Sequence, residues 1–398
     1  MPSCVIIVEN LPVPFDRRVW QEAQALRGAG WEVSVICPTS RQHHQRYEIL
    51  DGISIYRHPL PTEARYKLGF LLEYSAALVY EALLLCKIAL TRGFDVIQIC
   101  NPPDLLFVNA LPYKLFGKRL VFDHHDVCPE LFSTKFARKG LLHRLLLVAE
   151  KLTVKSANVV ISANDTFRNM AIERCGKSPD DVVTVYSVPD FTRVKRLPPN
   201  QQLRNGARVV LGYVGIISDQ DGVDHFVRMV HHLVVDHGCR EIGAVIVGDG
   251  PALPEVRQLA CDLHLQQPIT FTGYLRGDDL LSALSSFDIG VIPDPVNEYN
   301  DKISMNKVFE YSALGVPTVA YALSETRRLL GETARYADGT TPADLARACL
   351  PLIDDDDTRL KLGQAAKALA EERFDWARER AKYLDVYQRL TDEVIRPR

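Results

Sequence analysis

The segment Asn300–Pro317, NDKISMNKVFEYSALGVP, has the pattern of a helix that leads into a buried strand. Apolar side chains at Val308, Phe309 and Leu314 recur at helical spacing and should therefore face a core. Gly315 ends the predicted helix, and the proline two residues later begins the next strand. A helix followed at once by a short apolar strand is typical of an α/β protein.

Two charged residues of this helix, Lys307 and Glu310, lie three positions apart and therefore on one face near the helix start. Backbone N–H groups and the helix dipole attract phosphate at such an N-terminus. A lysine adds positive charge there, and a glutamate one turn later can bond the hydroxyls of a ribose. The pattern favours a nucleoside diphosphate site no more strongly than the alternative, an ordinary solvated ion pair.

Length and composition indicate a soluble protein with two domains. The chain has 398 residues, of which 47% are hydrophobic and 24% charged, and its net charge of −3 gives no general attraction to nucleic acid. Nine scattered cysteines, with Cys4, Cys37, Cys86 and Cys100 in apolar stretches, predict reduced core residues rather than a disulfide or zinc framework. The first ten residues predict a strand and lack a basic segment, so we expect a cytoplasmic protein.

Short apolar runs alternate with amphipathic helical stretches along the whole chain, which predicts two doubly wound α/β domains. The expected strands are Cys4–Val8, Val33–Cys37, Val96–Cys100, Leu120–Asp123 and Val159–Ser162, then Val209–Val214, Ala244–Val247, Ile269–Phe271, Ile289–Ile292 and Thr318–Ala320. A proline-rich polar stretch near residue 200 predicts a linker. We therefore expect domains at 1–198 and 207–373, a final helix at 374–398, and ligands in a cleft between the domains.

Glycines follow the predicted strands of the second half at Gly215, Gly248 and Gly250. A glycine there lets the backbone approach a phosphate closely, although many ordinary strand-to-helix turns also carry one. The next strand runs into Tyr274 and Leu275, whose backbone is suited to pairing with the edge of a base.

In the first half, His124, His125 and Asp126 directly follow a predicted strand. Such a cluster serves either as a metal site or as a polar contact to substrate. We expect no metal, because the other loops offer no matching ligands. A histidine held by a neighbouring carboxylate is a suitable substrate contact.

Six motifs in this order resemble the retaining glycosyltransferases of family 4, which have the GT-B fold. The motifs are residues 10–22, 123–130, 212–215, 248–251, 271–275 and 306–317. The resemblance extends to about residue 390 and is nearest to the bacterial branch that builds surface polysaccharides. It implies that a nucleotide-sugar donor binds mainly the second domain, and that a saccharide or lipid-linked acceptor binds mainly the first.

The resemblance implies that Glu310, the second glutamate of the family's Glu-x7-Glu motif, holds the donor ribose, with Asn306 beside it. The first glutamate of that motif is replaced by Lys302. Two basic residues that grip the diphosphate in the family are replaced by Ile216 and Asp221. Another cation should then face the leaving diphosphate. Lys307 is our first candidate and Lys302 the second.

On the acceptor side, His125 matches the family histidine near the donor sugar, and His124 is the weaker candidate. Asp16, Arg17 and Arg18 match the first-loop motif that faces the cleft, and Asp126 joins them. For the two arginines an ordinary surface pair at a helix start is the alternative. The expected catalytic set is thus His125 with Lys307 and Glu310.

The resemblance also implies front-face hexosyl or N-acetylhexosaminyl transfer with retention, in which the leaving phosphate takes the acceptor proton. No enzymatic nucleophile, metal or cofactor is needed, and positioning and charge stabilisation do the chemistry. The acidic run Asp354–Asp357 predicts a solvated turn with a helix N-cap rather than a metal site. A nucleotide-sugar epimerase, a donor hydrolase and a nonenzymatic partner subunit remain alternatives. A dinucleotide oxidoreductase is disfavoured, because the first strand lacks GxGxxG.

A membrane-spanning helix is not expected, since the most apolar stretch, Phe70–Leu90, carries three charges. Lys135–Lys155 has a leucine-rich face, many basic residues and one acid. Such a helix either lies on an anionic bilayer or packs normally with a basic outer face. The pattern favours peripheral contact with the inner face of the cytoplasmic membrane no more strongly than ordinary packing of this segment.

Overall fold

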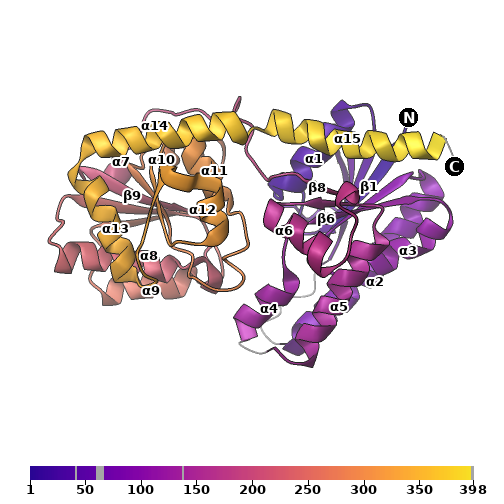
Figure 1. Ribbon diagram of the computed structural model, residues 1–398, viewed down its shortest axis with the longest axis horizontal. Helices are drawn as coiled ribbons and strands as arrows, with labels where there is room; N and C mark the ends of the chain where they lie inside the picture. Colours follow the sequence, from indigo (N-terminus) through magenta and orange to yellow (C-terminus); the bar gives the residue numbers. More distant parts are fainter. Residues whose placement is uncertain (41–42, 60–66, 137–138, 396–398) are drawn as a thin grey trace. The chain divides into compact units, whose positions relative to one another are not determined.

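The computed structural model describes residues 1–40, 43–59, 67–136 and 139–395, and the chain forms two compact units. The first unit is Met1–Ser187 with Arg378–Arg398, and the second is Val188–Ala377. Each unit has its own mainly parallel sheet with helices on its faces (Figure 1). The predicted α/β class with two doubly wound domains is confirmed.

The sheet of the first unit has the strand order β3-β4-β2-β1-β5-β6-β7-β8, and only the β3–β4 pair is antiparallel. Its strands are β1 (Ser3–Val8), β2 (Glu32–Pro38), β3 (Tyr47–Leu50), β4 (Ile53–His58), β5 (Val96–Cys100), β6 (Arg119–His124), β7 (Val159–Ser162) and β8 (Val182–Thr184). Its helices are α1 (Arg17–Gly28), α2 (Lys67–Thr91), α3 (Phe107–Leu115), α4 (Cys128–Phe136), α5 (Leu141–Ser156) and α6 (Asp165–Asn169), joined by the last helix, α15 (Trp376–Ile395).

The second unit has a parallel sheet in the order β11-β10-β9-β12-β13-β14. Its strands are β9 (Val209–Val214), β10 (Ile242–Val247), β11 (Ile269–Gly273), β12 (Ile289–Ile292), β13 (Thr318–Ala320) and β14 (Ala334–Tyr336). Its helices are α7 (Gln201–Arg204), α8 (Val223–His231), α9 (Leu253–Asp262), α10 (Gly277–Leu284), α11 (Asn306–Ala313), α12 (Ser324–Leu330), α13 (Pro342–Asp354) and α14 (Asp356–Arg373).

The strand order of each sheet reverses once, between β1 and β5 in the first sheet and between β9 and β12 in the second. Ligands of open α/β sheets bind at such a switch point, beyond the carboxyl ends of the strands. In the first sheet the register pairs Val8 with Cys100 and Cys100 with Asp123, so that the three strand ends lie level. The loops that follow these strands therefore meet at one edge.

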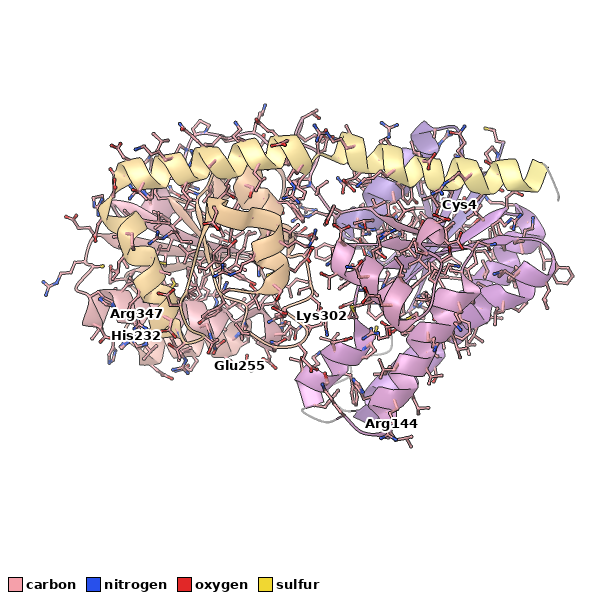
Figure 2. The ribbon with its side chains drawn as sticks, in the orientation of Figure 1. Cys4, Arg144, His232, Glu255, Lys302 and Arg347 are labelled. Carbon is pink, nitrogen blue, oxygen red and sulfur yellow. The ribbon has the colours of Figure 1, made fainter. Side chains whose placement is uncertain are left out.

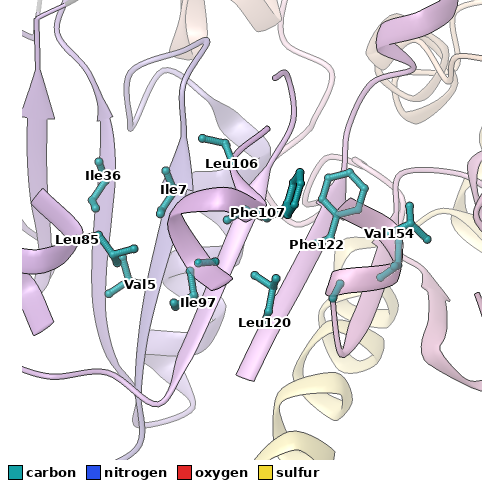
Figure 3. Close-up of a cluster of buried hydrophobic side chains, with 14 of the residues drawn as sticks. Val5, Ile7, Ile36, Leu85, Ile97, Leu106, Phe107, Leu120, Phe122 and Val154 are labelled. Atoms are coloured by element: carbon teal, nitrogen blue, oxygen red, sulfur yellow. The ribbon is translucent and has the colours of Figure 1, made fainter. Parts of the chain in front are cut away.

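The core of the first unit lies between its sheet and the layer formed by α2, α3 and α5. Figure 3 shows Leu85 of α2, Phe107 of α3 and Val154 of α5 over strand residues such as Ile97 and Phe122. Nearly all strand side chains here are apolar because a parallel sheet with helices on both faces is buried on both. This explains why uninterrupted apolar runs identified the strands.

Strands β3, β4, β8 and β14 were not predicted. The short strand β3 is partly exposed, β4 ends in the polar residues Arg57 and His58, and β8 and β14 span three residues each. None of the four therefore gives the continuous apolar run that marked the others.

The stretch around residue 200 is packed rather than free. Leu197 N–H donates to Ser285 Oγ (3.0 Å) and Asn200 N–H donates to Ser286 Oγ (2.7 Å), both within the second unit. The division between the units falls at residues 187 and 188, before this stretch, and not at the expected positions 198 and 207. The two prolines that suggested a linker stand in a segment tied down by hydrogen bonds.

At the end of the chain, Phe374 packs edge-on against Phe309 of the second unit (5.2 Å between ring centroids), and the chain rejoins the first unit from Arg378. Asp355 caps α14 by accepting hydrogen bonds from two backbone N–H groups, as the acidic run predicted. All nine cysteines are free, but Cys86 and Cys261 are exposed, so the expectation that Cys86 is a core residue was wrong. In the described part of the chain, no helix is long and apolar enough to cross a bilayer.

Candidate active site

The carboxyl end of β6 carries a cluster of hydrogen-bonded polar side chains in the first unit. Asp123 is fully buried, and Arg18 of α1 donates to both of its oxygens, from Nε at 3.1 Å and from Nη2 at 2.7 Å. The Nε2 atom of His125 lies 2.5 Å from Asp123 Oδ2. Although burial alone would raise it, the pKa of Asp123 is lowered, because Arg18 and His125 favour the charged carboxylate. Asp123 thus fixes the His125 ring while staying ionised.

Further residues hold this cluster in place from other elements. Gln98 of β5 donates from Nε2 to Glu22 Oε2 at 2.7 Å, and Arg18 Nε lies 3.2 Å from Glu22 Oε1. Burial and the charge of Asp123 raise the pKa of Glu22. Asn101 Oδ1 accepts from the backbone N–H of His125 at 2.7 Å and shapes the loop. Sequence reasoning missed Gln98, a polar residue inside a buried strand, and Asn101, the first residue after that strand, because neither belongs to a recognisable motif.

The other predicted acceptor-side residues have clear local roles. Asp16 caps α1 by accepting from Val19 N–H at 3.0 Å, and Asp126 Oδ1 accepts from the next backbone N–H, also at 3.0 Å. Arg17 is exposed, as expected for a surface position at a helix start, whereas Arg18 is buried. Of these residues, Arg18 joins the His125 cluster, through its hydrogen bonds to Asp123.

His124 is a core residue. Its side chain is buried between the rings of Phe122 and Phe167, with centroid distances of 5.2 and 4.9 Å. Burial, together with the charge of Arg174, lowers the pKa of His124 to about 3, so the ring is neutral at pH 7. It therefore points away from the polar cluster that surrounds His125.

Cys100, Asp123 and His125 bring three potential metal ligands within 4.8 Å of one another. The chemistry of the set does not suit a cation. Arg18 already occupies the Asp123 carboxylate, and burial, followed by the charge of Asp123, raises the pKa of the Cys100 thiol. These residues form an ion-pair network and give no support to a metal centre.

In the second unit the loops after β9, β10 and β11 are stacked at the carboxyl edge of the sheet. Gly215 N–H donates to Val247 O at 3.1 Å, and Gly248 N–H donates to Gly273 O at 3.0 Å. Gly248 has a φ of +148°, and a Cβ atom there would lie 1.9 Å from Gly215 O. At Gly250 an added Cβ would lie 2.3 Å from Ile217 O. Packing between backbones thus requires Gly248 and Gly250, whatever they contact in a ligand.

Helix α11 begins close to the loop after β9, because Lys307 Nζ lies 4.9 Å from the centre of the Tyr213 ring, whose hydroxyl donates to Ile216 O. Tyr311 ties it to the sheet, because its hydroxyl accepts from Val214 N–H at 3.1 Å and donates to Gly212 O at 3.2 Å. The Tyr311 ring packs directly on Gly290. A Cβ atom at that position would lie 2.6 Å from the ring, so a larger residue would clash with it. The N-cap residue Met305 makes no side-chain hydrogen bond to the helix end. The N-terminus of α11 is therefore held at the sheet edge without a cap from the Met305 side chain.

Lys307 is buried and paired, which the sequence did not indicate. Its Nζ donates to Asp294 Oδ2 at 2.7 Å and lies 4.9 Å from the centre of the Tyr213 ring. Burial raises the pKa of Asp294 to about 6 although Lys307 opposes the rise, and the charge of Asp221 adds to it. The ammonium group therefore shares its charge with a carboxylate. Asp294 could have been anticipated only from its place two residues after β12.

The remaining residues predicted for the donor side lie on α11, just before it, or after β11. Glu310 is buried on α11, Asn306 is exposed at its first position, and Lys302 is half-buried just before it. Tyr274 is exposed and Leu275 half-buried after β11.

The structure also shows the surroundings of the two residues that replace the basic residues of the family. Ile216 is exposed, and Asp221 accepts from Ser218 N–H at 3.1 Å in the following turn. The family's phosphate-gripping loop is thus a hydrogen-bonded turn with an acidic residue in this protein.

Two family models match the chain, one in each half. Residues 16–193 match Glycosyltransferase Family 4, and residues 208–355 match Glycosyl transferases group 1. The chain belongs to these glycosyltransferases. The D-inositol 3-phosphate glycosyltransferase of Corynebacterium kroppenstedtii is 31% identical over 257 residues, which cover 61% of this chain and 55% of that protein.

Two further relatives come from Streptomyces. A 2-deoxystreptamine N-acetyl-D-glucosaminyltransferase of Streptomyces fradiae is 27% identical over 59% of this chain and 60% of its own length. The 2-deoxystreptamine glucosyltransferase of Streptomyces kanamyceticus is 24% identical over 76% of this chain and 79% of its own length. The match thus spans little more than half of the first two relatives.

Solved structures of glycosyltransferases confirm the GT-B fold. Sucrose-phosphate synthase from Thermosynechococcus elongatus superimposes with a TM-score of 0.79 at 16% identity, covering 98% of this chain and all of that one. HepE of Anabaena, solved with UDP and glucose, gives a TM-score of 0.71 at 18% identity over 99% of both chains. At these identities the likeness concerns the fold alone.

Proposed function

We propose that this protein transfers a sugar from a nucleotide-sugar donor to a saccharide or lipid-linked acceptor, with retention of the anomeric configuration. The observation that carries the proposal is the α11 N-terminus, which lies close to the loop after β9 at the switch point of the second sheet and carries Lys307 and Glu310 on its first turns. Backbone N–H groups at such a position bind diphosphate. Family membership supports the same location for the donor.

In this proposal the donor diphosphate lies at the N-terminus of α11 and Glu310 accepts hydrogen bonds from the ribose hydroxyls. Asn306 and Lys302 are close to it in sequence, and Tyr274 and Leu275 contact the base. HepE of Anabaena was solved in complex with UDP, so UDP is the first nucleotide to test. The sugar remains either a hexose or an N-acetylhexosamine.

Lys307 is proposed to neutralise the charge that develops on the leaving diphosphate, because the basic positions of the family are Ile216 and Asp221 here. Its bond to Asp294 orients the ammonium group. Of its remaining N–H groups, one is proposed to reach a phosphate oxygen. Electrostatic stabilisation of this kind acts where charge appears in the transition state.

On the acceptor side, His125 is proposed to contact the transferred sugar, and Asp123 sets the orientation of its ring. We assign no nucleophile and no metal to the reaction. The leaving phosphate takes the proton of the acceptor hydroxyl as the new glycosidic bond forms and the bond to the phosphate breaks. The protein then contributes positioning and fixed charge.

The decisive experiment is the release of nucleoside diphosphate from UDP-, GDP- and ADP-sugars, with and without an acceptor panel. Release that depends on acceptor supports transfer. Release without acceptor, with free sugar as the product, would identify a hydrolase, and an isomerised sugar would identify an epimerase. A nucleotide-sugar that stays intact in every mixture would support a nonenzymatic partner subunit.

We further propose that α5 lies on an anionic lipid surface. Its outer face carries an exposed apolar stripe at helical spacing, Leu141, Leu145, Val148 and Leu152, with exposed fractions of 48% to 74%. The one acid of the helix, Glu150, is buried and pairs with Arg174. Figure 2 shows Arg144 at the lower end of α5 with its side chain pointing outward, and Arg144 is exposed. Apolar side chains with basic neighbours match an anionic bilayer.

The neighbouring helices extend this surface. Helix α3 exposes Val108, Leu111 and Leu115, and α2 exposes Val79 and Leu83. All three helices cover the same face of the first sheet, and among the described side chains of α2, α3 and α5 every exposed charged residue is basic. A second copy of this chain is a poor occupant, because two basic faces repel one another.

Co-sedimentation with vesicles tests the lipid contact. Vesicles that contain phosphatidylglycerol should bind the protein, pure phosphatidylcholine vesicles should bind it far less, and salt should weaken the binding. Leu145→Asp should abolish it, whereas Leu360→Asp, an equally exposed leucine of the second unit, should not. Equal binding by the two variants would contradict the proposal.

A further inference from the structure

The last helix, α15, is joined to the first sheet through one buried amide, that of Gln98 in β5. The Tyr383 hydroxyl donates to Gln98 Oε1 at 2.8 Å, and the Tyr387 hydroxyl donates to the same oxygen. All three side chains are fully buried. Two hydroxyl donors on one atom fix the orientation of the amide, because its nitrogen can only donate. The amide nitrogen is thereby left to bind acceptors elsewhere in the first unit.

Those acceptors are carboxyl groups of the His125 cluster. Gln98 Nε2 donates to Glu22 Oε2 at 2.7 Å and lies 3.4 Å from Asp123 Oδ2. The same Oδ2 atom lies 2.5 Å from His125 Nε2. The carboxylate oxygen that orients His125 is therefore also an acceptor for the amide that α15 orients. A continuous line of hydrogen bonds runs from α15 to His125.

A second line of hydrogen bonds from α15 reaches the same carboxylate. Glu379 is buried at the start of α15, and its Oε2 accepts from Tyr186 N–H at 2.8 Å. The carbonyl oxygen of the preceding residue, Val185, accepts from Arg18 Nη1 at 2.7 Å. Arg18 in turn donates to both oxygens of Asp123. The helix thus fixes the segment after β8 that anchors Arg18, and the two lines converge on Asp123.

The network ends on a side chain that a ligand can reach. The His125 side chain is 12% exposed, whereas that of Asp123 is fully buried. Asp123 is ionised and can only accept, so Nε2 of His125 carries a ring proton and points at the carboxylate. The ring is therefore held from its buried side and open on the other. Small displacements of a group that contacts substrate lower reaction rates strongly.

We propose that Gln98 is a positioning residue for His125, and that α15 completes the acceptor side of the site by fixing the Gln98 amide through Tyr383 and Tyr387. This inference rests on the proposed function, in which His125 contacts the transferred sugar. Gln98 and the two tyrosines are fully buried, so they act through Asp123 rather than on a substrate. Without the two hydroxyl donors the amide can turn, and Asp123 Oδ2 loses one of the groups that hold it.

NMR of the full chain, labelled with ¹⁵N at histidine, tests the positioning without any substrate. The ring nitrogen shifts show which nitrogen carries the proton, and His125→Gln assigns the signals of this ring by their loss. Wild-type His125 should be protonated at Nε2 alone. Combined Tyr383→Phe and Tyr387→Phe should give a mixture of both tautomers or broadened ring signals. Tyr336→Phe removes a hydroxyl that donates to Gly331 O in the second unit and, as the matched control, should leave the His125 signals unchanged.

Turnover, measured as acceptor-dependent release of nucleoside diphosphate, tests the link to the reaction. Gln98→Met should lower kcat by about tenfold and leave the donor KM within about twofold. In a His125→Ala background the same substitution should cause no further loss, because a residue that acts through His125 has no effect once that side chain is gone. If Gln98→Met does not fold, the double phenylalanine variant takes its place, since it adds no bulk.

His125 signals that are identical in wild-type protein and in the double phenylalanine variant would overturn the inference. An equal loss of turnover with and without His125 would also overturn it, because it would assign Gln98 a structural role only. Wild-type protein that releases no nucleoside diphosphate from any donor would refute the proposed function instead. The NMR comparison would still decide whether α15 positions His125.

Discussion

Asp123 is held by Arg18 through two hydrogen bonds, 2.7 and 3.1 Å long, which join β6 to α1 inside the first unit. The same carboxylate lies 2.5 Å from His125 Nε2. The buried carboxylate of Asp123 therefore bonds two side chains, Arg18 from α1 and His125 from the loop after β6. Arg18 also donates from Nη1 to the carbonyl oxygen of Val185 at 2.7 Å, so the guanidinium group fixes the end of β8 as well. This network makes the orientation of His125 dependent on residues distant in sequence.

Asp123→Asn should both destabilise the protein and lower its activity. Removing one partner of a buried ion pair costs about 3–5 kcal/mol, because the other charge is left uncompensated. His125 also loses the carboxylate that orients it, so nucleoside diphosphate release should fall by more than the loss of folded protein explains. Asp385→Ala, at an exposed position on α15 in the same unit, is the control and should change neither quantity. Wild-type stability and turnover in Asp123→Asn would show that the network is dispensable.

His124 should make the stability of the first unit sensitive to acid. The unfolded chain protonates this histidine near pH 6.5, whereas the native pKa is lowered to about 3. Between these values the unfolded state binds more protons, so stability falls as the pH falls. His124→Phe fits between Phe122 and Phe167 and cannot titrate. Relative to this variant, wild-type protein should lose about 3 kcal/mol between pH 7 and pH 4.

Two neighbouring acids oppose this effect in both proteins, because a raised pKa of a buried acid makes stability rise as the pH falls. Burial and the charge of Glu150 raise the pKa of Asp104 to about 7, and burial raises the pKa of Glu150, whose Oε1 lies 4.0 Å from His124 Nε2. The comparison between wild-type protein and His124→Phe therefore isolates the histidine. Denaturant melts with parallel pH dependence in the two proteins would contradict the buried neutral ring.

Lys307 should matter for catalysis beyond its ion pair with Asp294. Lys307→Met alone leaves Asp294 buried without its partner and should cost about 3–5 kcal/mol of stability. Adding Asp294→Asn removes that uncompensated charge and should recover most of the stability. Turnover should stay low in the double variant, because the cation at the diphosphate is still missing. Recovery of turnover together with stability would assign Lys307 a structural role only.

Prediction from the sequence worked best for features that depend on residues close together in the chain. Apolar runs identified ten strands, because strands between two helical layers show no polar face, as at Val96–Cys100. Glycine positions and the order of motifs indicated the loops of the second unit that we propose to bind the donor. Pairings between distant residues could not be read in this way. Nothing adjacent to Arg18 reveals that Asp123 is its partner, and nothing adjacent to Lys307 reveals that it is buried against Asp294.

The last helix should be required for the stability of the first unit. Tyr383 donates to Gln98 Oε1 at 2.8 Å, Tyr387 also bonds to Gln98, and Glu379 accepts from Tyr186 N–H at 2.8 Å. Deleting residues 378–398 exposes these partners and should unfold the first unit and abolish activity. The milder pair Tyr383→Phe and Tyr387→Phe should each cost about 1 kcal/mol.

A matched control lies on the same helix. Asp385→Ala removes an exposed ion pair with Arg389 and should change stability by less than about 0.5 kcal/mol. A truncated protein with an unchanged melting temperature would mean that α15 is a dispensable tail.

The central claim is that the second unit binds a nucleoside diphosphate with Glu310 on its ribose, and calorimetric titration tests it most directly. Wild-type protein should bind at least one of UDP, GDP and ADP. Glu310→Ala should keep the fold and weaken that binding by about 1–3 kcal/mol, the range for a hydrogen bond to a charged group. Glu255→Ala should bind as the wild type does. Binding that is equally strong in Glu310→Ala, or no binding of any of the three nucleotides, would contradict the account.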